Sequence, residues 1–273
     1  MQNPESGSAT DVEGRTDKGV SRTLSLSVPR RVMCDLLAFA KAIPTVPVQR
    51  QMNVASVAAA RTRLALEADA PGWCAIFTKA YAITALRFPE LRRAYLSVPR
   101  AHLYEHSHSI ASIAVERRYE GENAVFWGQL RRPERQSLGE LQAHLRRYKD
   151  EPIQNFGLFR RVLLLGRLPW PVRRLAWWIG LNFSGRKRAS YIGTFGVSVY
   201  SSLGAESLHP ISPLTTTLNY GAIASDGSVS VRIVYDHRVM DGATVARALA
   251  YLEGVLNREI VAELEQQAKT LAA

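Results

Sequence analysis

The sequence predicts an α/β fold with a mixed β-sheet, and three observations support this prediction. Along the chain, segments whose apolar residues have helical spacing are interspersed with short segments in which apolar and polar residues alternate, as in strands. The chain has 273 residues and is 47 % hydrophobic, which is enough to bury a sizeable core. Between residues 24 and 258 there is no internal repeat and no Pro-rich or Ser-rich linker, so this range is expected to form one domain.

The N-terminal part is predicted to alternate between strands and helices. Residues 1–23 contain no apolar run and are expected to be a disordered tail. Residues 23–28 alternate as a short strand, which Pro29 ends. A helix is expected next at 31–43, where Pro44 stops it, and an extended segment follows at 46–54. Two further helices are expected at 57–68 and 73–87, followed by a helix end and loop at 88–96. Strands are then expected at 109–115 and 123–129, separated by a turn at 119–122.

The C-terminal part continues the mixed pattern. A helix is expected at 137–148, with Ser137 well placed to cap it. Strands follow at 192–200, 215–223 and 228–235, and a hairpin turn at 225–227 joins the last two. Residues 242–256 carry one apolar stripe and predict a final helix, after which residues 259–273 form a C-terminal helical tail.

Composition limits the functional classes. The longest uncharged apolar segment, residues 175–185, has 11 residues and falls short of the roughly 20 that a membrane-spanning helix needs. The two cysteines, Cys34 and Cys74, match neither a metal-ligand spacing nor a CxxC motif, which argues against a disulfide framework and a zinc site. The protein is therefore expected to be cytoplasmic, to be soluble or at most peripheral to a membrane, and to hold no metal.

The positive charge is concentrated in one segment. Lys and Arg number 35 against 24 Asp and Glu, for a net charge of +11. No carboxylate occurs from residue 152 to 205, whereas eight basic residues do: Arg160, Arg161, Arg167, Arg173, Arg174, Arg186, Lys187 and Arg188. No recognisable nucleic-acid-binding motif accompanies these residues, so nucleic acid is not the expected partner.

The stretch VSVRIVYDHRVMDGATVARAL, residues 229–249, is the most informative part of the sequence. A predicted strand ends at His237, and Asp241 and Gly242 open the following helix. A histidine at a strand end is held by the sheet yet open to solvent, which suits a general base near neutral pH. Asp241 stands at the N-cap position, where its carboxylate can accept backbone N–H groups. The alternative interpretation is a hydrogen-bonded core histidine.

The segment DHRVMDGA, residues 236–243, contains an HxxxDG motif and resembles the catalytic domain of the 2-oxo acid dehydrogenase acyltransferases, the E2 components. More distantly it is similar to chloramphenicol acetyltransferase. Upstream, SVYSSLGAESLHPISPLTTTLNYGAI resembles the segment in which such enzymes carry a serine shortly before a Leu-Gly pair. Residues 30–54 look like the opening helix and strand of the family, and residues 77–96 look like a later helix.

The resemblance implies a chloramphenicol acetyltransferase-like two-layer fold that forms trimers, with a mixed sheet covered by helices. His237 would be the general base, and Ser201 would donate a hydrogen bond to the tetrahedral oxyanion. Asp241 would hold the motif through an ion pair, for which Arg30 and Arg31 are candidates. In this family the histidine of one subunit meets the serine region of its neighbour, which implies a homotrimer.

The acyl donor follows from the same resemblance. A complete E2 chain has a lipoyl domain and a peripheral-subunit-binding domain before its catalytic domain, and this chain has room for neither. Thr16-Asp17-Lys18 is interpreted as a chance match to a lipoylation site. The expected donor is a coenzyme A thioester. The alternative donor is a lipoyl group or an acyl-carrier protein supplied in trans. This chain itself is expected to carry no lipoyl lysine and no metal.

Residues 156–190 form an insertion where the family has only a short link. The insertion contains Trp170, Trp177 and Trp178 beside the arginines. It could be a lid over an acyl-chain channel, with Arg173, Arg174, Arg186 and Arg188 as candidates for binding coenzyme A phosphates. It could also lie on an anionic membrane surface, or simply add core packing.

Three function classes remain after these steps. The leading hypothesis is a stand-alone E2-like acyltransferase. The alternative is a non-catalytic E2-like trimeric assembly or scaffold protein, and a nucleic-acid-binding module is supported by charge alone. The cluster His102, His106 and His108 is interpreted as a surface loop rather than a metal site.

Overall fold

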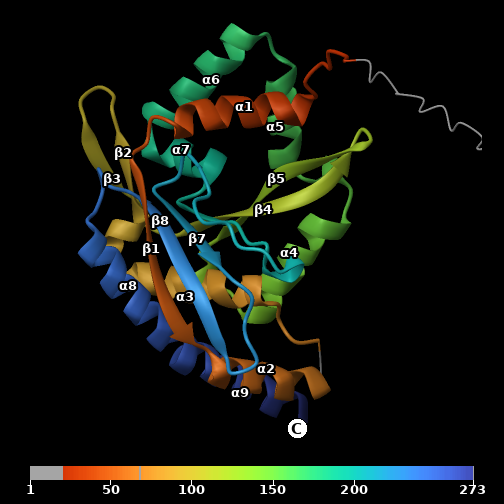
Figure 1. Cartoon of the computed structure of the whole chain (residues 1–273), viewed down its shortest axis with the longest axis vertical. Coiled ribbons are helices and arrows are strands. Elements are labelled where there is room, and N and C mark those ends of the chain that lie inside the picture. Colours follow the sequence, from red (N-terminus) through yellow and green to blue (C-terminus); the bar gives the residue numbers. More distant parts are fainter. Residues whose placement is uncertain (1–20, 68, 273) are drawn as a thin grey trace, which may run out of the picture.

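The computed structural model describes residues 21–67 and 69–272 (Figure 1). Residues 1–20 of the predicted tail therefore lie outside the described residues. Six strands form one mixed sheet in the order β1-β8-β7-β6-β4-β5, and β2 and β3 form a separate hairpin. β6 runs parallel to β4 and to β7, and the other pairs are antiparallel. The strands are β1 Thr45–Asn53, β2 Arg93–Leu96, β3 His102–Glu105, β4 Ile110–Tyr119, β5 Glu122–Arg131, β6 Phe195–Val197, β7 Thr216–Tyr220 and β8 Ser228–Asp236.

Helices cover this sheet, so the predicted two-layer α/β class is confirmed. They are α1 Val28–Ala40, α2 Ala55–Glu67, α3 Trp73–Arg87, α4 Leu138–Asp150, α5 Gly157–Arg167, α6 Trp170–Asn182, α7 Gly185–Ile192, α8 Gly242–Val255 and α9 Val261–Ala272. A π-helical turn, Leu256–Ile260, joins α8 to α9. In Figure 1, α3 and α8 lie behind the sheet, whereas α1, α5, α6 and α7 gather at the upper end of the molecule. Among the described residues, none of the helices is both long enough and apolar enough to cross a membrane.

The predicted strand at 23–28 is wrong. Residues 21–27 have no regular structure, and α1 begins at Val28 with Pro29 in its first turn. Proline is favoured at that position because the first helical N–H groups have no partner within the helix. The Ser27 side chain caps the helix by accepting the Arg30 N–H at 3.3 Å. The proline that was expected to end a strand therefore starts a helix.

Two other segments differ from the prediction. The expected loop at 88–96 instead holds a short 3₁₀ turn and β2, which pairs with β3. The strand expected at 192–200 is reduced to the three residues of β6, because α7 runs to Ile192 and Gly193 then turns the chain with a φ of +83°. A positive φ of this size is cheap only for glycine. The remaining predicted elements are confirmed with small shifts of their ends, including the Ser137 cap of α4.

The helix α3 lies at the centre of the main core, and ten of its 15 residues are buried. Phe77 stacks on Tyr220 of β7 with ring centroids 4.1 Å apart, and Tyr81 stacks on Phe195 of β6 at 4.3 Å. The Tyr81 hydroxyl also donates to Thr216 Oγ1 at 2.6 Å. These contacts fix the two central strands against one helix.

The C-terminal helices also belong to this core. Ile260 and Leu264 are completely buried in it. Glu263 forms an ion pair with Lys79 of α3 and accepts the N–H of Leu138, the first residue of α4, at 2.8 Å. One carboxylate on α9 therefore holds the two helices that line one side of the sheet.

The insertion packs against α1 through one face. Arg173 forms a buried ion pair with Asp35, and Trp177 packs in a small cluster with Val32 and Leu36. On α5, Phe159 packs against Phe126 of β5 with ring centroids 5.0 Å apart. This inner face adds core, as one of the three interpretations of the segment expects.

The two adjacent tryptophans of α6 should differ in their effect on stability. Trp177 is 6 % exposed and Trp178 is 42 % exposed. Trp177→Ala is expected to lower the free energy of unfolding by about 3 to 5 kcal/mol, because it empties a buried site. Trp178→Ala, the matched control, should lower it by no more than about 1 kcal/mol. Urea denaturation of both variants measures the difference, and equal losses would contradict the described orientation of α6.

Candidate active site

His237 stands immediately after β8, in a turn that the sheet holds on both sides. The Asp236 N–H donates to Thr215 O, next to β7, at 2.8 Å. The His237 N–H donates to Pro44 O, next to β1, at 3.0 Å. The imidazole itself is about half exposed. The backbone is therefore fixed while the ring remains open to a ligand, as expected for a general base at a strand end.

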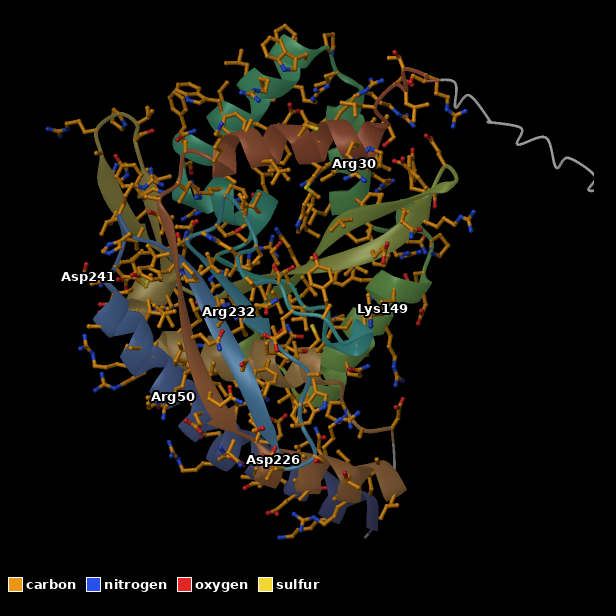
Figure 2. All side chains as sticks on the ribbon, in the orientation of Figure 1. Arg30, Arg50, Lys149, Asp226, Arg232 and Asp241 are labelled. Carbon is orange, nitrogen blue, oxygen red and sulfur yellow. The ribbon has the colours of Figure 1, made fainter. Side chains whose placement is uncertain are left out.

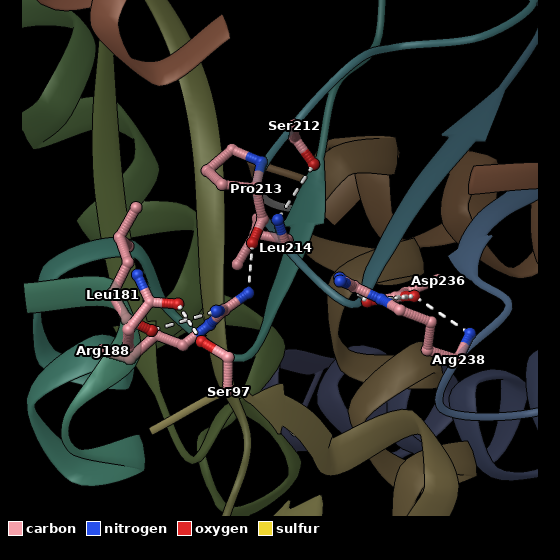
Figure 3. Close-up of polar contacts among 9 residues, drawn as sticks. Ser97, Leu181, Arg188, Ser212, Pro213, Leu214, Asp236 and Arg238 are labelled. Carbon is pink, nitrogen blue, oxygen red and sulfur yellow. Dashed lines mark hydrogen bonds and ion pairs between the residues drawn. The ribbon is translucent and has the colours of Figure 1, made fainter. Parts of the chain in front are cut away.

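The two neighbours of His237 form a second anchor. Asp236 is buried, and its carboxylate accepts the Arg238 backbone N–H at 3.0 Å, Nε at 2.9 Å and Nη2 at 2.7 Å (Figure 3). The Arg238 guanidinium also lies 4.3 Å from the centre of the Tyr95 ring. Sequence analysis used these residues only as flanks of the motif. The opposite charges on either side of the histidine were the signal that could have identified the anchor.

Asp241 stands at the N-cap position of α8, but its side chain makes no capping hydrogen bond, so the predicted cap is wrong. The carboxylate is exposed, and Oδ1 lies 3.7 Å from His237 Nδ1. The carboxylate faces the imidazole rather than the helix N-terminus. Arg30 lies on α1, well away from Asp241 (Figure 2), and Arg31 Nε donates to Leu26 O at 2.9 Å. Neither arginine forms an ion pair with Asp241 among the described residues.

Ser201 lies in a 3₁₀ turn, Ser201–Leu203, at the other end of β7. It lines a cavity of about 630 Å³ together with Tyr220 and Gly221. The other lining groups include the apolar residues Trp73, Ile113, Val115, Leu145 and Val197, the basic residues Arg146 and Lys149, and the neutral polar residues Gln142 and Ser202. Burial raises the pKa of Tyr220 well above its usual value, an effect that a hydrogen bond with the Ser201 side chain partly offsets. A serine hydroxyl beside an apolar cavity with basic residues on its wall can donate to an anionic oxygen.

Cys74 also lines this cavity, and sequence analysis gave it no chemical role. Burial raises the pKa of the Cys74 thiol to about 11. The thiol is therefore protonated at neutral pH, and only a thiolate would be a good nucleophile. Cys74 is part of the cavity wall.

His237 and Ser201 do not meet within one chain. Thr216, which pairs with Tyr235, begins β7 near His237, whereas Tyr220 ends β7 near Ser201. The four intervals between these residues span about 14 Å, since each residue of an antiparallel strand adds about 3.4 Å. In Figure 2, Asp241 beside His237 lies at the left of the view and Lys149 of the Ser201 cavity lies at the right.

Two of the four arginines expected to bind coenzyme A phosphates are engaged inside the protein. Arg173 is buried against Asp35. Arg188 donates to Leu181 O at 3.1 Å and to Pro213 O (Figure 3). Burial lowers the pKa of Arg188 to about 10, so that it stays charged at neutral pH. These two arginines hold the insertion in place, contrary to the expectation that they face a ligand.

The other two arginines are more accessible. Arg174 is half-buried and lies 5.1 Å from the centre of the Phe39 ring and 5.9 Å from that of Trp170. Arg186 is exposed and lines a cavity of about 450 Å³ beside His106 and His108. Both remain candidates for binding an anion.

The three histidines before β4 lie in different surroundings. His102 is exposed and contacts Arg100 O through Nδ1 at 2.7 Å, whereas His106 is buried. Within the described part of the chain, no group of three or more His, Cys, Asp and Glu residues is arranged to hold a metal ion. Burial, and then the charges of Arg188, His108 and Arg92, lower the pKa of His106 to about 4.

His106 should make the stability of the protein depend on pH. The unfolded chain binds a proton at His106 near pH 6.5, whereas the folded chain binds it only near pH 4. Its contribution is therefore complete above pH 6.5 and is lost as the pH falls from 6.5 to 4, by roughly 3 kcal/mol. His106→Gln should remove this pH dependence of the free energy of unfolding in denaturant titrations. The control His144→Gln, which changes an exposed histidine of α4, should keep it. Identical pH profiles for wild type and His106→Gln would contradict the prediction.

Comparison with known proteins agrees with this architecture. No family model matches the sequence, and no curated protein matches it. Among solved structures, the dihydrolipoamide acetyltransferase of Azotobacter vinelandii is similar with a TM-score of 0.65 and 17 % identity, over 89 % of this chain and 94 % of that chain. A probable dihydrolipoamide acetyltransferase from Listeria monocytogenes has a TM-score of 0.62 and 17 % identity, over 87 % and 95 % of the two chains.

A third structure, a truncated catalytic core of the 2-oxoacid dehydrogenase multienzyme complex from Thermoplasma acidophilum, has a TM-score of 0.63 and 17 % identity. The match covers 87 % of this chain and 99 % of that chain. Each match covers nearly all of the solved chain, so the shared fold includes the whole of both layers. The resemblance inferred from the sequence is thus confirmed at the level of the fold, and the chain has the fold of the dihydrolipoamide acetyltransferase catalytic cores.

Proposed function

We propose that the protein is a stand-alone acyltransferase of the E2 type. It moves an acyl group between coenzyme A, or a lipoyl group supplied in trans by another protein, and a thiol, hydroxyl or amine acceptor. The observation that carries the proposal is His237, whose backbone is fixed by β1 and β7 while its imidazole remains half exposed beside a carboxylate. A purely structural role would not require an open imidazole at this position.

The proposed reaction uses His237 as the general base. Its neutral imidazole removes the proton of the acceptor as the acceptor sulfur, oxygen or nitrogen attacks the thioester carbonyl. Asp241, 3.7 Å from Nδ1, stabilises the imidazolium that forms. The tetrahedral intermediate then expels the donor thiolate, which takes the proton back from the imidazolium. The acyl group ends on the acceptor, and the base returns to its neutral form.

The serine of a second subunit would complete this site. Ser201 lies at the opposite end of β7 from His237, so one chain does not supply both groups to one carbonyl. In a homotrimer, the Ser201 cavity of one subunit would face the His237 turn of the next, and the hydroxyl would donate to the developing oxyanion. In the Azotobacter enzyme, a serine, a histidine and an asparagine four positions after that histidine have been investigated for roles in catalysis. His237 and Asp241 have the same spacing.

Removal of the imidazole is the direct test of this mechanism. His237→Ala and His237→Gln should lower acyl transfer by at least about 100-fold and leave the fold unchanged, because a general base contributes at least that much. The measurement is the formation of free coenzyme A, separated by chromatography from the acyl-coenzyme A donor, for a panel of such donors with thiol, hydroxyl and amine acceptors. The control is His144→Gln, which changes an exposed histidine of α4 outside the site. Activity within about threefold of wild type in both His237 variants would favour the scaffold alternative.

Subunit mixing tests whether the two groups meet between chains. Ser201→Ala is expected to lower kcat by about 100-fold, because its hydrogen bond strengthens as charge develops on the carbonyl oxygen. Ser202→Ala, which changes a second serine of the same cavity, should have a much smaller effect. Mixed His237→Ala and Ser201→Ala subunits should regain part of the activity, since some interfaces then carry both native residues.

The control for this experiment is the double variant, which should restore nothing when it is mixed with either single variant. Mass spectrometry of intact oligomers verifies that the subunits have exchanged. If exchange is complete and no activity returns, the two residues act within one chain or one of them has no catalytic role.

A further inference from the structure

The outer face of α6 is apolar and has no partner within the described chain. The inner face, with Arg173, Trp177 and Leu181, packs against α1 and its cluster. Five large side chains elsewhere on the helix and at its end are 45 to 63 % exposed: Trp170, Val172, Leu175, Ile179 and Phe183. A helix that is apolar nearly all round is normally covered on every side. In Figure 1, α6 lies at the upper end of the molecule, away from α2 and α9, and among the described residues its outer side chains are left exposed.

Basic residues stand just before, within and shortly after this helix in the sequence. Arg167 is exposed just before α6, Arg174 lies on α6 beside the Trp170 ring, and Lys187 is exposed at the start of α7. Within the described ranges none of the three forms an ion pair with a carboxylate. No Asp or Glu occurs from residue 152 to 205, so the charged residues of this segment are all basic. Asp35 of α1, which pairs with Arg173, is buried on the inner side of α6.

We propose that α6 is a peripheral binding site for an anionic phospholipid bilayer. Exposed tryptophan and aliphatic side chains beside basic residues are the combination that binds the headgroup region of such a surface. The 13 residues of α6 rise about 20 Å, less than the about 30 Å of a bilayer core, so the helix would lie along the surface. A protein partner would not require basic residues in and around the helix, and a nucleic acid would not require the apolar face. The proposal does not depend on the acyltransferase activity.

Vesicle binding of the full chain tests the proposal. Vesicles of phosphatidylcholine with phosphatidylglycerol should sediment the protein at low salt, whereas vesicles of phosphatidylcholine alone should bind it at least tenfold more weakly. Binding should blue-shift the tryptophan emission, because Trp170 and Trp178 are exposed in the free protein. Raised salt should weaken the binding by screening the charges.

Matched variants separate the apolar contribution from the ionic one. Leu175→Gln with Ile179→Gln should weaken binding by at least tenfold, and the control Leu66→Gln with Leu271→Gln, on α2 and α9, should not. The triple change Arg167→Gln, Arg174→Gln and Lys187→Gln should weaken it by about 100-fold, at about fivefold for each charge. Its control, Arg50→Gln with Arg63→Gln and Arg258→Gln, removes the same net charge elsewhere. Circular dichroism must show that each variant is folded.

Three results would overturn the proposal. The first is no binding of the wild type to either kind of vesicle at low salt. The second is binding that both sets of α6 variants leave unchanged, which would place the membrane contact elsewhere or show unspecific attraction. The third is a loss of oligomer in the Leu175 and Ile179 variant, seen by light scattering without vesicles, which would assign the face to a second copy of the chain.

Discussion

The antiparallel pairing of β7 with β8 is the constraint on which the rest of the candidate site depends. The pairing sets His237 at one end of β7 and leaves Ser201 and its cavity at the other. Because β7 is also held against α3 by the stacking of Phe77 on Tyr220, the two ends cannot approach each other without disrupting the core. Under the proposed function, Ser201 and His237 would act on one carbonyl only across two molecules, so the proposed chemistry would require an oligomer.

Buried charges, each with a defined partner, hold the parts around the site. Asp236 takes three hydrogen bonds from Arg238 and keeps the turn of His237 in shape. Arg173 and Asp35 tie the insertion to α1, and Arg188 ties α7 to the Leu181 carbonyl of α6 and to the Pro213 carbonyl of the loop before β7. Removal of one partner from such a pair leaves a charge stranded in the interior, which costs far more than the pair itself contributes. The arginine-rich segment therefore combines structural guanidinium groups with exposed ones, and the two kinds have different roles.

The sequence predicted correctly those elements that depend only on residues close together in the chain. The apolar stripe of α8 and the serine cap of α4 required no knowledge of the partners, and both agree with the structure. The role of Pro29 was misread because a proline can end a strand or begin a helix, and only the packing of α1 decides between them. The burial of Arg173 and Arg188 depended on Asp35, Leu181 and Pro213, which a count of charges along the chain does not reveal. The HxxxDG spacing identified the histidine but not the environment of Asp241, whose carboxylate faces the imidazole.

The sheet order has a consequence for how the protein must be made. β1 lies at the edge of the sheet and has β8 as its strand partner, with Thr45 opposite Asp236 and Asn53 opposite Ser228. During synthesis from the N-terminus, β1 therefore leaves the ribosome long before the strand that satisfies its backbone groups. α9, which supplies Glu263 to α3 and α4, emerges later still. Until the last helix is made, the sheet is incomplete and its unpaired strands can pair with other chains. We therefore expect aggregation during translation to compete with folding more strongly here than in a protein of mostly local contacts.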